Sequence, residues 1–81
     1  MNNYETDYES QPITATAAQH IKNLDYIQCD FLNLPKEMQE ENEDVNDAIE
    51  NMLEFLDNIK PERTLSIQYN DNINTFTWEF I

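Results

Sequence analysis

Carboxylates dominate the middle of this sequence. Nine of them fall between Glu37 and Asp57, and no Lys or Arg separates them. Most neighbours in this row are three or four residues apart, the spacing that brings side chains to one side of a helix. The chemistry open to such a row is the binding of positive charge. Its members are Glu37, Glu40, Glu41, Glu43, Asp44, Asp47, Glu50, Glu54 and Asp57.

These acids repel one another if they share one helix. They form ten like-charge pairs, six at a separation of three residues and four at a separation of four. At roughly 0.2–0.5 kcal/mol per pair at low salt, the pairs destabilise the helix by about 2–5 kcal/mol. This is a large share of the stability of a small domain. We therefore expect the acidic surface to bind a partner; the alternative is a solvated face that only keeps the protein soluble.

The charge balance limits which partners the chain can have. Its 81 residues include 17 Asp and Glu but only four Lys and Arg, for a net charge of -13. Nucleic acids and anionic membranes are bound by neutralising phosphates with Lys and Arg, so direct contact with either is not expected. The expected partner is a basic protein. Because no apolar run has the length of a signal peptide or a membrane span, we expect a cytoplasmic protein.

Several chemistries lack their residues. The sequence has no Gly, which excludes a Walker A loop, a dinucleotide-binding fingerprint and an EF-hand loop, so turns must use Asn and Asp. A Cys–His nucleophile pair needs His20 beside Cys29; we expect instead a packed Cys29 and a partly exposed His20. Glu40, Asp44 and Asp47 offer oxygen ligands, but a straight helix cannot wrap a calcium ion. We expect no enzyme, no cofactor and no specific metal site.

The first third of the chain is predicted to hold an arm, a helix and a strand. Residues 1–11 have no apolar periodicity and predict a flexible acidic arm, whose Tyr4 and Tyr8 are possible contact aromatics; residues 12–81 form one domain. Helical spacing of apolar residues predicts a helix from Pro12 to Asn23, capped by Ser10 or Thr14. Alternation over residues 26–31 then predicts a half-buried strand.

The rest of the chain is predicted to form one long helix and a hairpin. An apolar stripe from Met38 to Ile59 predicts a helix of about 25 residues that begins near Pro35 and ends before Pro61. A two-residue Asp71-Asn72 turn pairs Leu65 with Trp78, Ile67 with Phe76 and Tyr69 with Asn74; a three-residue loop 70–72 is the alternative. The expected class is α+β, a three-stranded antiparallel sheet with the long helix on one face. Its expected core is Ile21, Leu24, Ile27, Phe31, Ile49, Met52, Leu53, Leu56, Leu65, Ile67, Phe76 and Trp78.

The acidic row suggests imitation of nucleic acid. Its charges step about 4.5–6 Å along a helix and extend about 30 Å, comparable with the phosphate density of duplex DNA, one charge per 3.4 Å of each strand. This predicts a DNA-mimic inhibitor of a nucleic-acid-binding protein, in physical character like the small acidic inhibitors that phages and mobile elements direct against restriction enzymes, CRISPR effectors and repair enzymes. The alternatives are an immunity protein or antitoxin for a basic nuclease toxin, and an acidic oligomerisation module.

Overall fold

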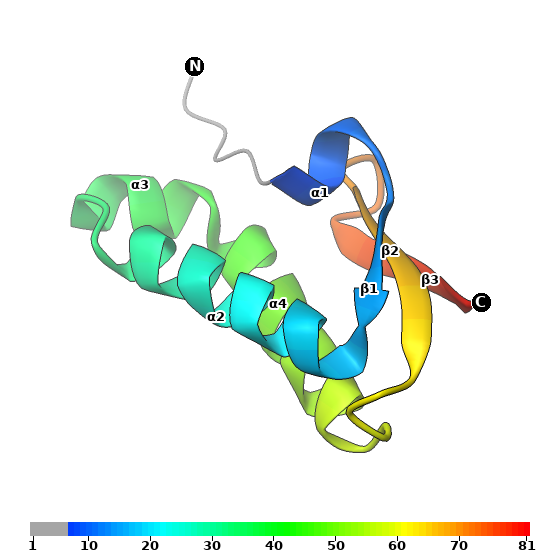
Figure 1. Cartoon of the computed structure of the whole chain (residues 1–81). Helices are drawn as coiled ribbons and strands as arrows, with labels where there is room; N and C mark the ends of the chain where they lie inside the picture. The colour runs from blue at the N-terminus through cyan, green and yellow to red at the C-terminus, as the bar shows by residue number, and fades with distance from the viewer. Residues whose placement is uncertain (1–6) are drawn as a thin grey trace.

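The computed structural model describes residues 7–81 and folds them into a three-stranded antiparallel sheet with helices packed against it (Figure 1). The predicted α+β class, with helices followed by a C-terminal hairpin, is confirmed at this level. The strand order is β1-β2-β3. The elements are α1 (Asp7–Ser10), β1 (Ile13–Thr16), α2 (Ala17–Leu32), α3 (Lys36–Glu41), α4 (Glu43–Asp57), β2 (Thr64–Asn70) and β3 (Thr75–Phe80).

The first strand lies where a helix was expected. Residues Ile13–Thr16 pair antiparallel with β2, from Ile13 opposite Ile67 to Thr16 opposite Thr64. The helix begins only at Ala17, and its N-cap is Thr16, whose Oγ1 accepts a hydrogen bond from the Gln19 backbone at 3.2 Å. The predicted start near Pro12 and the predicted caps, Ser10 or Thr14, were therefore wrong. Thr and Ile favour strands, and pairing with β2 outweighs the helical spacing.

The predicted strand at residues 26–31 is the second half of α2. Within so short a window, alternation also fits a helix, because Leu24, Ile27 and Phe31 follow one another at steps of three and four. Leu24 and Phe31 are buried and Ile27 packs against the core. Cys29 lies on the opposite side of the helix and is exposed, so the prediction that it packs in the core was wrong.

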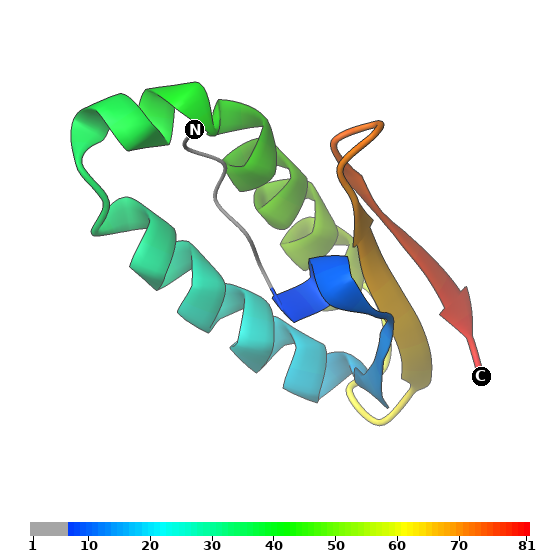
Figure 2. The same cartoon turned by 90° about the horizontal axis from the view of Figure 1, so that it is seen from above.

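The predicted long helix is interrupted at Asn42, which separates α3 from α4. Asn42 leaves helical geometry at φ -117° and ψ 28°, and Figure 2 shows the change of direction between the two helices. Its side-chain nitrogen donates to the Met38 carbonyl at 2.8 Å, while its own carbonyl accepts from Val45 at 3.0 Å. Asn is suited to such a junction because its short side chain bonds to nearby backbone.

The hairpin has the predicted strands in a different register. Leu65 pairs with Phe80, Ile67 with Trp78 and Tyr69 with Phe76, a shift of two residues from the predicted pairs. The loop is residues 71–74, and Asn74 takes the left-handed conformation at φ 53°, so Asn serves in a turn as expected for a chain without Gly. Both the two-residue turn and the three-residue alternative were wrong. A shift of two preserves the faces of both strands.

Most of the predicted core is confirmed. Ile21 and Leu53 are partly buried and pack against it, as Ile27 does. Trp78 is the exception: it is 44% exposed, so the prediction of a buried Trp78 was wrong. The predicted core residues that are buried are Leu24, Phe31, Ile49, Met52, Leu56, Leu65, Ile67 and Phe76.

A polar network joins the N-terminal segment to the core. Tyr8 and His20 are both 0% exposed, so neither the expected partial exposure of His20 nor a contact role for Tyr8 holds. The Leu65 carbonyl can only accept, so His20 donates from Nε2 at 2.9 Å, while its Nδ1 forms a hydrogen bond with the Tyr8 hydroxyl at 2.9 Å. Residues 1–6 of the predicted arm, including Tyr4, lie outside the described residues.

Candidate functional site

Helix α4 has one acidic side and one apolar side. Five of its carboxylates recur at steps of four, three, four and three residues, which places them along a single stripe. The buried residues of the helix, from Val45 to Leu56, face the opposite direction toward the core. All nine predicted site residues are exposed to solvent. The five that form the stripe, which we call the α4 acidic stripe, are Glu43, Asp47, Glu50, Glu54 and Asp57.

The other four predicted residues lie apart from this stripe. Asp44 is on α4 but faces the start of β3, where its Oδ2 accepts a hydrogen bond from Asn74 Nδ2 at 3.4 Å. Glu37, Glu40 and Glu41 belong to α3, beyond the break at Asn42. The single straight row of about 30 Å was therefore wrong. The straight part extends over the 15 residues of α4, and the 14 steps from Glu43 to Asp57 cover about 21 Å at 1.5 Å per step. The α3 acids continue the row in a different direction.

The break at Asn42 lowers the repulsion among the acids. Of the ten pairs at helical separations, three join residues on opposite sides of Asn42, which leaves seven within one helix. At roughly 0.2–0.5 kcal/mol each, those seven destabilise the helices by about 1.5–3.5 kcal/mol at low salt. The acidic surface therefore remains costly to the free protein.

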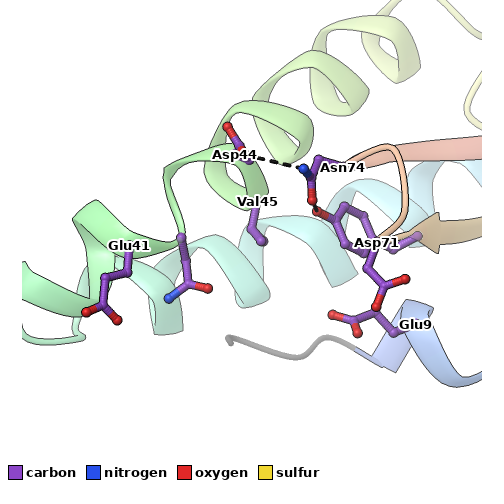
Figure 3. Close-up of a pocket in the computed structure, with 8 residues that line it drawn as sticks. Glu9, Glu41, Asp44, Val45, Asp71 and Asn74 are labelled. Atoms are coloured by element: carbon purple, nitrogen blue, oxygen red, sulfur yellow. Dashed lines mark hydrogen bonds between the residues drawn. The ribbon is translucent and has the colours of Figure 1, made fainter. Parts of the chain in front are cut away.

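A second group of acids gathers around a depression between α1, the α3–α4 junction and the hairpin loop (Figure 3). Its volume is about 190 Å³. Glu41 and Asp44 come from the predicted row, whereas Glu9 and Asp71 are contributed by α1 and the loop. Asn42, Val45, Tyr69 and Asn74 complete the lining. We call this place the acidic depression.

The negative charge around the acidic depression affects the pKa of Tyr69. Burial raises the pKa of its phenol above the usual value, and the carboxylates of Glu9, Asp44 and Asp71 raise it further because they repel a phenolate. Its hydroxyl donates to Asn74 Oδ1 at 3.5 Å. Carboxylates from α1, α4 and the hairpin loop therefore all affect the ionisation of the Tyr69 phenol.

No pattern in the amino-acid sequence indicates that Glu9 and Asp71 join this group. Asp71 was assigned to the turn and Glu9 to the arm, and 62 residues separate them. The burial of Tyr8 holds α1 against β2, and this contact brings Glu9 to the depression. The one available signal was Tyr8 itself, an aromatic residue among polar neighbours. Such a residue predicts packing against the core, but it does not indicate against which element.

The described part of the chain holds neither a metal-binding cluster nor a Cys–His nucleophile pair. Residues 7–81 contain no group of three His, Cys, Asp or Glu side chains arranged to hold a metal ion. His20 is buried and Cys29 is exposed nine residues later on α2, about 13 Å along the axis, so they form no nucleophile pair. Within the same residues, no helix combines the length and the apolar character needed to cross a membrane.

Comparisons with known proteins were made for the whole chain. No family model matches the chain, and no curated protein or solved structure is significantly similar to it.

Proposed function

We propose that this protein is an inhibitor that imitates the phosphate backbone of DNA and occupies the basic groove of a nucleic-acid-binding protein. The observation that carries the proposal is the α4 acidic stripe, five exposed carboxylates in line with no basic residue among them. Lys and Arg side chains that grip phosphates would meet carboxylates at steps of about 4.5–6 Å.

The acids on α3 and around the depression extend this surface beyond the stripe. The direction changes at Asn42, so the anions follow a bent path, as phosphates do around a duplex. A net charge of -13 would also attract a basic partner from a distance and speed association. The target fits a restriction enzyme, a CRISPR effector or a repair enzyme, all of which bind DNA through basic surfaces.

The test is a competition titration with the partner captured by pull-down from the source cell. Duplex DNA should displace this protein, and added salt should weaken the complex. The variant Asp47→Asn, Glu50→Gln, Glu54→Gln should bind roughly tenfold more weakly, at about 0.5 kcal/mol for each lost exposed ion pair.

A matched control changes the same net charge elsewhere. Asp25→Asn, Asp30→Asn and Glu62→Gln also remove three exposed carboxylates, two from α2 and one from the loop before β2, and should bind as wild type does. The proposal is wrong if the partner holds DNA and this protein together, as an immunity protein bound beside the active site would allow. It is also wrong if the two triple variants bind equally.

A further inference from the structure

The outer edge of β3 offers an unpaired strand. Within residues 7–81, β3 pairs with β2 on one side and with no strand on the other, and no helix lies beyond it in either view (Figures 1 and 2). The Ile81 backbone N–H donates to the Thr64 carbonyl of β2 at 3.2 Å. Backbone groups of successive residues face opposite sides of a strand, so every second residue counted back from Ile81 faces β2 and the residues between them face away. Phe76, Trp78 and Phe80 therefore direct their backbone N–H and C=O groups toward the open edge.

This edge has little of the usual protection against pairing. Natural edge strands are kept apart by charged side chains, especially Lys, by Pro, by bulges or by short length. The other edge, β1, has four residues and follows Pro12. In contrast, β3 has six residues without Lys or Pro, and Glu79 is its one charged residue. Its Trp78 stacks on Phe55 of α4 with ring centroids 4.5 Å apart and contacts Phe80 at 5.1 Å, while remaining 44% exposed.

We propose that a second copy of this chain pairs with β3 through its own β3, antiparallel, to form a continuous six-stranded sheet. The register places Trp78 opposite Trp78 of the second copy, and Phe76 opposite Phe80. All outward backbone groups of these three residues then find partners. Glu79 faces Thr77 of the second copy, so no like charges are opposed.

Neighbouring registers are worse. A shift by two in one direction opposes Glu79 to Glu79 of the second copy, which like-charge repulsion disfavours. A shift by two in the other direction sets Phe80 opposite Asn74 of the hairpin loop and leaves it without an aromatic partner. A shift by one turns the aromatic residues to opposite faces.

Charges at the two ends of β3 fit the same arrangement. Arg63 lies over the Phe80 ring, 4.2 Å from its centroid. At the other end, Asp44 bonds to Asn74, and Asp47 borders a hollow with Ile73 and Thr75. The two-fold axis through Trp78 brings Arg63 of each copy toward the Asp44 and Asp47 end of the other. These two contacts oppose the repulsion between chains that each carry a charge of -13.

Sedimentation of the full chain tests the proposal. We expect a monomer–dimer equilibrium between micromolar and millimolar concentration. The dimer should be favoured by salt, because screening shortens the Debye length from about 10 Å at 0.1 M to about 3 Å at 1 M and so weakens the overall repulsion. A protein that stays monomeric under all these conditions overturns the proposal.

Substitutions at Thr77 test the register. This side chain is exposed and belongs to the sheet face away from the helices, so the fold should tolerate change there. Thr77→Glu opposes Glu79 twice in the dimer and should weaken it roughly fivefold, whereas Thr77→Lys should strengthen it by a similar factor.

Matched controls are Thr14→Glu and Thr14→Lys on the exposed edge strand β1, which change the net charge equally. They should shift the equilibrium by less than the changes at Thr77. If Thr77→Lys weakens the dimer as Thr77→Glu does, or if both Thr14 variants match their Thr77 counterparts, the proposed pairing is wrong. Because this test needs no partner protein, its outcome is separate from that of the inhibitor proposal.

Discussion

Tyr69 couples the acidic depression to stability at high pH. Burial and the nearby anions raise the pKa of its phenol in the folded state. The raised pKa gives a contribution to the free energy of unfolding that is fully present below the unfolded pKa of about 10. This contribution is lost as pH rises through the folded pKa, because the unfolded chain releases the phenol proton first. We predict that the melting temperature falls above about pH 10 and that Tyr69→Phe falls less steeply.

Melting curves across this range and the ultraviolet absorbance of the phenolate measure the effect. Tyr26→Phe is the matched control, since Tyr26 is 72% exposed and far from these acids in sequence. It should keep the Tyr69 contribution to the phenolate signal, which Tyr69→Phe removes. If the melting temperature falls equally with rising pH in wild type and Tyr69→Phe, the loss of stability does not come from Tyr69.

Single-residue exposure was predictable for the acids and not for the polar core. Nine ionised carboxylates cannot all be buried in so small a domain, so their exposure follows from residue type. The burial of His20 depends on Tyr8 and Leu65, which lie 12 and 45 residues away in the sequence. Nothing local to His20 indicates those two partners.

At the level of elements, the hairpin register decides which aromatic residue matters most for folding. Phe76 is 7% exposed and contacts Tyr69 and Tyr8 edge to face, whereas Trp78 is 44% exposed. We predict that Phe76→Ala costs about 3–5 kcal/mol, the range for buried aromatic residues, and that Trp78→Ala costs clearly less. Chemical denaturation of both variants measures the difference. A larger loss for Trp78→Ala would favour the register in which Trp78 opposes Leu65.

Element types could be predicted where two independent signals agreed. The strands of the hairpin combine alternation with a central turn, so their faces were right although the register was displaced by two residues. Residues 26–31 offered alternation alone, which also fits a helix. The break at Asn42 left the apolar spacing almost unchanged, so periodicity carried no sign of it.

At the level of the whole molecule, long-range contacts bring together acidic residues that no local sequence pattern relates. Pairing of Ile13–Thr16 with β2 supplies the third strand, and α1 then contacts β2. These two long-range contacts determine that Glu9 and Asp71 meet Asp44 around Tyr69. The acidic surface is therefore broader than the row visible in the sequence.

Salt should act on the free protein and on its complex in opposite directions. Screening weakens the seven like-charge pairs that remain within α3 and α4, so we predict that NaCl raises the melting temperature of the free protein. Relief of about 1 kcal/mol corresponds to a rise of about 4–8 °C for a domain of this size. The variant Asp47→Asn, Glu50→Gln, Glu54→Gln removes several of these pairs and should melt higher than wild type at low salt but respond less to added salt. Equal salt dependence in the two proteins would mean that the stripe is not strained. If the prediction holds, the carboxylates that destabilise the free protein are the same ones that a basic partner neutralises. The complex should therefore lose affinity at the salt concentrations that stabilise the free protein.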